Sequence, residues 1–316
     1  MFRKEVSPIQ MGVWVLCAMV GPMCLLAGHI SWLMAISVGL LCLVLCFVMW
    51  TVPQKDLCKA FCVIEYMGAV LVLGYFARWS ADLWPTGRGY PTVPLTMLFI
   101  AVFAALNGTQ GAARISCVLA YLLILLYSIV LAAGLEQIDG EHLHTENTAI
   151  PMAAVAVLLL PAGVWLLPVK AKGISKTFLI GAGVLFAALC VWTSGILTEA
   201  AAAKLKWPFY EATKSLSFLG IAERFEALVS VASTMSFFAL YSYLLSIAGA
   251  MTERIKSGWG KGGIITAAAA AGAIMPFAHK LRIAVVLTAI LLWGIMPLTS
   301  HFNKVTKKYK KDKKSA

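Results

Sequence analysis

Two short glycine- and proline-containing segments are the parts of this sequence best suited to bind a small solute. Proline has no backbone N–H and clashes with the preceding helical turn, so it frees backbone groups of its helix. Inside a membrane those groups must face protein, ligand or water. The pattern predicts two interrupted helices whose N–H and C=O groups hold a carboxylate and an amino group, although proline and glycine also produce simple kinks. The segments are Gly21, Pro22 and Met23, and Pro161, Ala162 and Gly163.

Polar side chains within other apolar stretches are candidates for binding a coupling ion, Na⁺ or H⁺. Glu65 lies in one such stretch, where an ionisable group is costly unless it has a function. It could bind a proton or cation, or pair with a basic group near the membrane surface. Tyr66 follows it and is expected to help line the solute pocket. A further stretch carries hydroxyls on one helical face, which could coordinate Na⁺ or simply join helices. These are Ser230, Ser233 and Thr234, with Ser236 beyond them.

A charge cluster precedes these hydroxyls, with Glu223, Arg224 and Glu226 at the start of the same apolar stretch. Carboxylates in a first turn suit the helix dipole, so capping and interfacial pairing are the expected roles. No metal site is expected, because the histidines at 142 and 144 lie in a loop of turn-forming residues. Nucleotide-binding and hydrolase motifs are also missing from the sequence. The sequence therefore predicts neither an enzyme nor a cofactor.

The elements that position these residues are predicted from composition. Apolar residues make up 61% of the 316-residue chain, charged residues 13%, and the mean hydropathy is +0.86. A soluble domain has about 45–50% apolar and about 25% charged residues. The chain is therefore expected to be an all-α polytopic membrane protein, with apolar stretches near the ~20 residues that cross a bilayer. Ten spans are expected, at 8–28, 31–51, 57–84, 93–107, 112–134, 150–168, 176–198, 219–250, 263–277 and 281–299.

Basic residues predict the orientation of these spans. With both termini in the cytoplasm, 18 of the 26 lysines and arginines fall on the cytoplasmic side and 7 outside, as the positive-inside rule requires. The lysine-rich tail, 301–316, is expected to contact anionic lipid headgroups. The net charge of +12 therefore needs no nucleic-acid partner.

The two proline segments fall in the first and sixth of the ten spans, at matching positions of two sets of five. Such a pair is typical of an inverted-repeat transporter whose substrate site lies near the bilayer midplane. The predicted organisation is a first five-helix repeat at 1–134, an acidic extracytoplasmic loop at 135–149, a second repeat at 150–300 and the polybasic cytoplasmic tail.

Several short segments distributed over the chain carry a family resemblance. They are Ser7 to Gln10, Pro53 with Asp56 and Leu57, Pro94 to Gly108, Gly111 to Ile115, Trp207 to Tyr210, and Ser215 to Leu228. Together they resemble the B subunits of spore germinant receptors, within the amino acid–polyamine–organocation transporter superfamily. Members of that family are usually some tens of residues longer. Their glycine-rich break in the first helix is reduced here to Gly21, Pro22 and a short run to His29.

The resemblance implies a leucine-transporter-like fold in a bacterial plasma membrane or inner spore membrane. It also implies an amino acid or similar germinant as ligand, and receptor A and C subunits as partners. Three functions follow as alternatives: an amino-acid permease, the ligand-sensing subunit of a germinant receptor, and a membrane scaffold or signalling subunit without transport.

Overall fold

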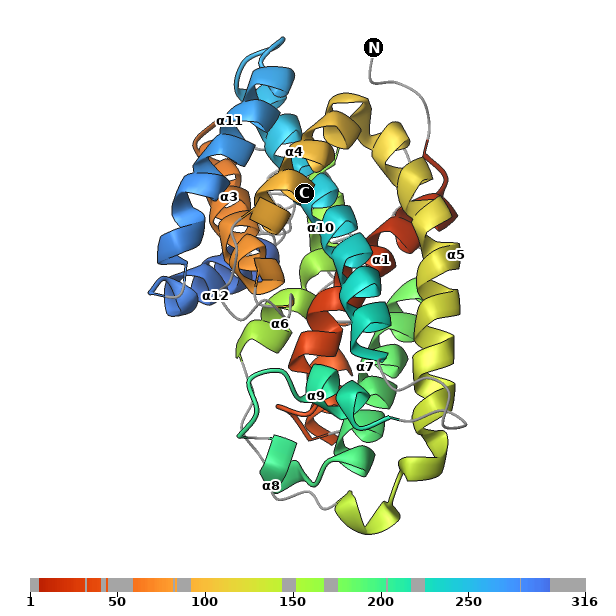
Figure 1. The fold of residues 1–316 in the computed structure, drawn as a ribbon. Helices are drawn as coiled ribbons and strands as arrows, with labels where there is room; N and C mark the ends of the chain where they lie inside the picture. The colour runs from red at the N-terminus through yellow and green to blue at the C-terminus, as the bar shows by residue number, and fades with distance from the viewer. Residues whose placement is uncertain are drawn as a thin grey trace, which may run out of the picture.

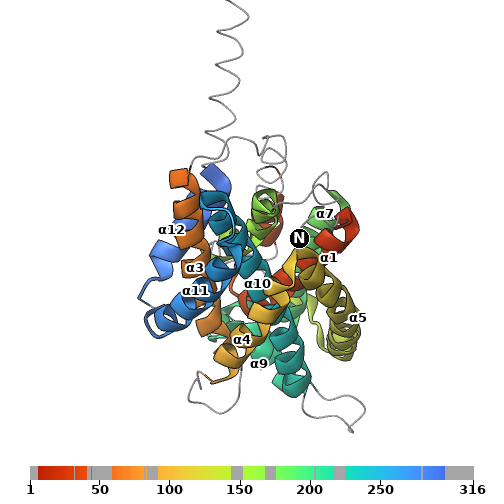
Figure 2. The ribbon, with the colours of Figure 1, turned by 90° about the horizontal axis from the view of Figure 1, so that it is seen from above.

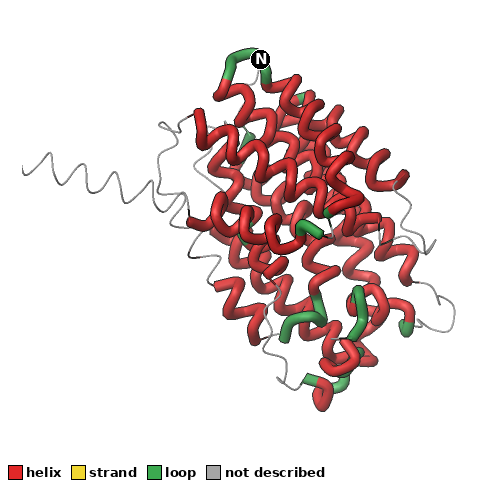
Figure 3. The backbone as a smooth tube through the Cα atoms, turned by 90° about the vertical axis from the view of Figure 1, so that its left-hand side faces the viewer, coloured by secondary structure: helices red, strands yellow, loops and turns green. Residues whose placement is uncertain are grey.

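The computed structural model describes residues 6–31, 33–40, 44, 59–81, 83, 92–143, 152–167, 176–202, 204–216, 225–278 and 280–295. Within these ranges every regular element is helical and none is a strand, which confirms the all-α prediction (Figure 3). Residues 144–149 of the predicted loop 135–149, the tail 301–316 and about half of the predicted span 31–51 lie outside the described residues.

The helices follow the predicted spans closely at most positions (Figure 1). The longer ones are α1 (Pro8–Leu26), α3 (Lys59–Ala81), α4 (Thr92–Leu106), α5 (Gly108–Gly134), α7 (Lys176–Ile196), α10 (Phe225–Ile255), α11 (Gly260–Ile274) and α12 (Arg282–Ile290). The short ones are α6 (Met152–Leu158), α8 (Glu199–Ala202), α9 (Pro208–Lys214), the 3₁₀ turns η2 (Leu135–Gln137), η3 (Gly140–His142), η4 (Leu160–Leu166) and η5 (Met275–Phe277), and the π-helical η6 (Leu291–Ile295).

Four helices among the described residues are long and apolar enough to cross a membrane: α1, α3, α10 and the continuous segment Gly108–Gln137. Several others are shorter apolar helices, so ten crossings and the orientation of the termini stay predictions. One boundary was wrong. The predicted span ending at residue 250 continues helically to Ile255, so Arg254 belongs to α10 and not to a loop.

Helix α10 lies at the centre of the bundle. Figures 1 and 2 show it running between α1 and α5 on one side and α3, α4 and α11 on the other, and it contacts all five. Its apolar and small residues are buried almost continuously from Ser236 to Met251, with a short interruption at Phe238. A helix that is apolar on all sides belongs in such a position. Polar groups on α10 must therefore find partners on the surrounding helices.

Helix α5 presents the opposite pattern, since it exposes a long apolar face. Val118 is 64% exposed, Tyr121 78% and Ile124 65%, and Phe99 on the neighbouring α4 is 63% exposed. Soluble monomers rarely leave such contiguous apolar surface in water. The exposed face is the kind of surface that lipid covers.

The turn between α10 and α11 is held by one carboxylate. Glu253 accepts hydrogen bonds from the N–H groups of Gly258 and Gly260, at 3.0 and 2.9 Å. Gly258 has a φ of +87°, a conformation that favours glycine. The ammonium of Lys256 lies 4.3 Å from the ring centroid of Trp259. Glu253 thus satisfies two N–H groups at the start of α11.

Replacing Glu253 with alanine is expected to loosen this turn. The variant loses two charge-assisted hydrogen bonds, so the N–H groups of Gly258 and Gly260 lose their carboxylate partner. Hydrogen–deuterium exchange in residues 256–262 should accelerate, while exchange at the middle of α10 stays unchanged. Lys261→Ala, which removes an exposed side chain of the same segment, is the control and should leave exchange as in the parent protein. Equal exchange in Glu253→Ala would refute the capping role.

Candidate functional site

The first proline segment does not interrupt its helix. Helix α1 begins with a capping box, in which the Ser7 hydroxyl accepts from the Gln10 N–H at 3.1 Å, and it continues through Pro22 to Leu26. The predicted break is therefore a local disturbance of the hydrogen-bond pattern within a continuous helix. Pro22 has no N–H to donate to the carbonyl of Ala18. The turn beside it is altered by a side chain from another helix.

That side chain is Ser236 of α10. The Gly21 N–H donates to the Ser236 hydroxyl at 2.6 Å, and the same hydroxyl donates to the carbonyl of Cys17. In a regular α-helix the Gly21 N–H would donate directly to the Cys17 carbonyl. The hydroxyl is thus inserted into the backbone ladder of α1, one of the recognised ways in which a helix is distorted.

Glycine at position 21 makes this insertion possible. A Cβ atom there would lie 2.8 Å from the Ser236 hydroxyl oxygen and 3.0 Å from its Cβ. Helices α1 and α10 therefore cross at very close range, and all the groups involved are buried. Close approach of small residues is a common way to pack helices in lipid.

The second proline segment does change helix type. Helix α6 ends at Leu158, and η4 continues from Leu160 to Leu166 as a 3₁₀ helix with Pro161 at its start. The Leu160 carbonyl accepts a hydrogen bond from the Tyr243 hydroxyl of α10, at 2.7 Å. A Cβ on Gly163 would lie only 2.8 Å from that hydroxyl. Pro161, Ala162 and Gly163 are all buried.

Both proline segments therefore contact the same face of the same helix. Ser236 and Tyr243 are seven residues apart, which places them on one side of α10 two turns from each other. Trp14 of α1 closes the space between them. Its indole N–H lies 3.2 Å from both the Ala239 carbonyl and the Ser242 hydroxyl, and its ring packs edge-on against Tyr243 at 5.4 Å. We call Ser236, Tyr243 and the backbone groups that they bind the hydroxyl site.

The predicted hydroxyls Ser230, Ser233 and Thr234 have separate roles. Ser233 lies 3.2 Å from the Tyr127 hydroxyl of α5, and Ser230 donates to the Leu83 carbonyl at 3.2 Å. Thr234 donates back to its own helix, to the Ser230 carbonyl at 2.7 Å. Only Ser233 lies beside the first segment, because its carbonyl is 3.4 Å from the position of a Cβ on Gly21.

Other predicted site residues lie away from the hydroxyl site. Tyr66 pairs with the Thr266 hydroxyl of α11 at 2.8 Å on an exposed surface, so the predicted contribution to the pocket does not agree with its position. Met23 is fully buried beside Pro22 in α1. Glu226 lies in the first turn of α10, as expected, whereas Glu223 and Arg224 lie outside the described residues.

Glu65 is fully buried, and among the described residues neither of its carboxyl oxygens has a hydrogen-bond partner within bonding geometry. Within the described part of the chain, the alternative interpretation, that Glu65 pairs with a basic group, has no ion pair to support it. The structure also does not bring Glu65 to the hydroxyl site, since its neighbours are on α12 and η6.

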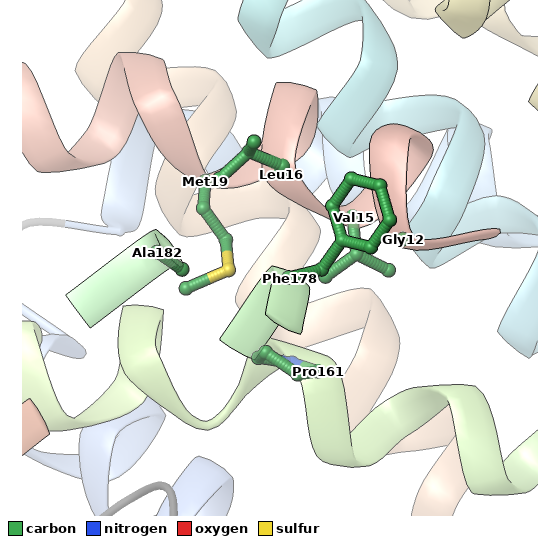
Figure 4. Close-up of a pocket in the computed structure, with 7 residues that line it drawn as sticks. All are labelled: Gly12, Val15, Leu16, Met19, Pro161, Phe178 and Ala182. Carbon is green, nitrogen blue, oxygen red and sulfur yellow. The ribbon is translucent and has the colours of Figure 1, made fainter. Parts of the chain in front are cut away.

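A small apolar pocket lies between α1, η4 and α7 (Figure 4). Figure 4 shows Met19 and Phe178 facing each other across it, with the Pro161 ring at one edge. Its lining has no polar side chain, so it offers nothing to orient a carboxylate or an ammonium group. The lining residues are Gly12, Val15, Leu16, Met19, Pro161, Phe178 and Ala182.

Sequence reasoning missed Tyr243, Trp14 and Tyr127, which complete the polar contacts around the two segments. The available signal was the seven-residue spacing from Ser236 to Tyr243 on one predicted helix. The described residues contain no group of three or more His, Cys, Asp or Glu side chains that could hold a metal ion. In comparisons with known proteins, no protein-family model and no curated protein sequence matches this chain.

Proposed function

We propose that this chain is a membrane protein that recognises a small amino acid or a related amine at the hydroxyl site. The observation that supports the proposal is the shared use of α10. Two proline-containing segments, one from each half of the chain, have backbone groups bound by hydroxyls of this one helix. Side-chain hydroxyls can rotate and exchange one partner for another. A ligand with matching groups could therefore replace these contacts.

The chemistry of the site suits an amino acid. The Gly21 N–H and the hydroxyls of Ser236 and Tyr243 are donors that a carboxylate can accept from. The carbonyls of Cys17 and Leu160 are acceptors for an ammonium group. In the present conformation these groups satisfy each other and the site is closed. Ligand entry would require α1 and the α6–η4 segment to move away from α10, as in alternating access.

The proposed setting is a bilayer crossed ten times, with two inverted five-helix repeats and both termini in the cytoplasm. The exposed apolar face of α5 supports a lipid environment. The resemblance to germinant-receptor B subunits supports a second candidate function, in which the chain senses its ligand for larger A and C subunits without net transport. Na⁺ or H⁺ is the proposed coupling ion for a transporter.

Uptake into proteoliposomes distinguishes the two functions. Protein reconstituted with an imposed Na⁺ or H⁺ gradient is tested with a panel of radiolabelled amino acids, and empty liposomes are the control. Gradient-dependent accumulation of at least one amino acid is expected from a permease. Saturable binding without accumulation, together with co-purification of a larger subunit from a spore-forming host, is expected from a sensor. The absence of both binding and uptake across the panel would refute recognition of amino acids.

A further inference from the structure

A second polar site lies between α3 and η6, the last helical element that the structure describes. It shares no residue with the hydroxyl site. Figures 1 and 2 show α3 and α12 side by side at one flank of the bundle. Glu65 is 0% exposed on this flank, and within the described ranges neither of its carboxyl oxygens makes a hydrogen bond. A buried carboxyl group without a partner is rare in a native protein and requires an explanation.

The group beside Glu65 is the indole of Trp293. Trp293 is 1% exposed, and its N–H meets no acceptor at strict hydrogen-bond geometry among the described residues. The indole N–H and the carboxyl group therefore lie beside each other, and a protonated or ionised carboxyl can accept from this N–H after a small adjustment. Trp293 belongs to the π-helical η6, and π-helical turns within helices occur frequently at functional sites.

The backbones of α3 and η6 approach closely at this point. A Cβ on Gly68, one turn beyond Glu65, would lie 2.0 Å from Cδ1 of Leu292 and 3.2 Å from Cγ2 of Thr288. Dense packing excludes water from Glu65. Burying an ionised carboxylate without a partner is strongly unfavourable, and in practice such a group is neutralised.

No described basic group neutralises Glu65. Arg254 of α10 is one candidate, since it lies near Cys62, one turn before Glu65. One of its guanidinium nitrogens is buried without a partner among the described residues, and neither oxygen of Glu65 accepts a hydrogen bond from the guanidinium. On α11, Lys261 is exposed to solvent. The nearby carboxylate of Glu253 is occupied by the turn after α10.

A metal cation fits this environment poorly. Na⁺ and the divalent cations require several oxygen ligands, whereas the indole beside Glu65 is a donor only. A proton needs a single carboxyl oxygen. The protonated acid also removes the charge that the packed interior cannot accommodate.

We propose that Glu65 is a proton-binding site and that its proton holds α12 and η6 against α3. When the proton leaves to water, the ionised carboxylate requires hydration or the Arg254 guanidinium. Either change requires the Trp293 side of η6 to separate from α3. The proposal goes beyond recognition of the solute and does not depend on it, because protonation is measured without any amino acid present.

Infrared difference spectroscopy of the intact protein in lipid nanodiscs tests this proposal. The parent protein is expected to show the C=O stretch of a protonated carboxylic acid at neutral pH, and this band should disappear as the pH rises. The same band should be missing from E65Q. E211Q, which alters an exposed carboxylate paired with Lys214 at 2.8 Å, is the matched control and should retain it. Identical spectra from the parent protein and E65Q at every pH would overturn the proposal.

Hydrogen–deuterium exchange in residues 282–295 gives the conformational readout. Exchange in the parent protein should rise several-fold on the alkaline side of the transition seen by infrared. E65Q keeps the shape of the neutral acid, so it should fold and show slow exchange at every pH. W293F should retain the carboxylic acid band at a shifted frequency, because the neighbouring N–H is lost. A pH-dependent rise in E65Q equal to that of the parent protein would also overturn the proposal.

Discussion

Replacing Gly21 with leucine is expected to prevent stable folding of the bundle. The Cβ atom alone would lie 2.8 Å from the Ser236 hydroxyl oxygen, and the rest of the side chain has no space between α1 and α10. Overpacking a well-packed core costs about 1–3 kcal/mol and occasionally more, and this site should be at or above the upper limit. The expected result is a large loss of monodisperse protein on size-exclusion chromatography and a lower midpoint of thermal unfolding in detergent.

Three further variants assign this effect to the α1–α10 contact. Gly181→Leu on α7 is the control, because nothing lies within 4 Å of a Cβ at that position. It should fold as the parent protein does. The Gly21→Ala variant should be moderately destabilised. The double variant, Gly21→Ala with Ser236→Ala, should regain part of that stability, because it lacks the Ser236 hydroxyl oxygen that lies nearest to the new Cβ. A stable Gly21→Leu protein, or no interaction between Gly21→Ala and Ser236→Ala, would contradict the close crossing.

Replacing Gly163 with leucine is expected to have a comparable effect at the second proline segment. A Cβ there would lie 2.8 Å from the Tyr243 hydroxyl and 2.9 Å from Cδ1 of Ile247. The larger side chain must displace Tyr243 and so remove the hydrogen bond to the Leu160 carbonyl. A buried carbonyl left unsatisfied adds about 1–3 kcal/mol to the cost of overpacking. The thermal unfolding midpoint in detergent measures the combined loss.

The matched control for this variant is Gly262→Leu on α11, where nothing lies within 4 Å of a Cβ. Its unfolding midpoint should equal or exceed that of the parent protein, since leucine favours helix more than glycine does. If Gly163→Leu unfolds at the same temperature as Gly262→Leu, the contact between η4 and α10 does not hold the second segment.

These two glycines show how far the sequence could predict the site. Gly21 with Pro22, and Gly163 with Pro161, were identifiable as disturbed helix positions from residue types alone. The side chains that bind their backbone groups were not identifiable in this way, because Ser236 is 215 residues from Gly21 and Tyr243 is 83 residues from Leu160. Contacts between residues so far apart in the sequence depend on how the helices pack. Local residue patterns do not reveal that packing.

The prediction for the first helix went wrong for a physical reason. Pro22 removes one backbone bond, but it does not require the helix to unwind when a neighbouring side chain supplies the missing contacts. The Ser236 hydroxyl both accepts and donates, so α1 remains helical through the site. At Pro161 the Tyr243 hydroxyl only donates to a carbonyl, and there the chain changes to a 3₁₀ helix.

Tyr66 and Glu65 illustrate a second limit. They are adjacent in sequence, and Glu65 was predicted to bind a coupling ion and Tyr66 to help line the solute pocket. Neighbouring residues on a helix point about 100° apart. Tyr66 therefore faces α11 and reaches Thr266, while Glu65 faces α12 and η6. The apolar pattern of α3 could place Glu65 within a span. It could not indicate which of the surrounding helices would cover it.

Ligand-induced thermal stabilisation of the purified protein, measured against an amino-acid panel, shows whether α10 carries a solute site. A ligand at about 100 times its dissociation constant stabilises the native state by about 2.7 kcal/mol. At least one amino acid should raise the unfolding midpoint of the parent protein and of E211Q. The rise should be lost or much smaller in Tyr243→Phe and Ser236→Ala, even where these variants fold. An equal rise in all four proteins, or no rise with any amino acid, would contradict a solute site on α10.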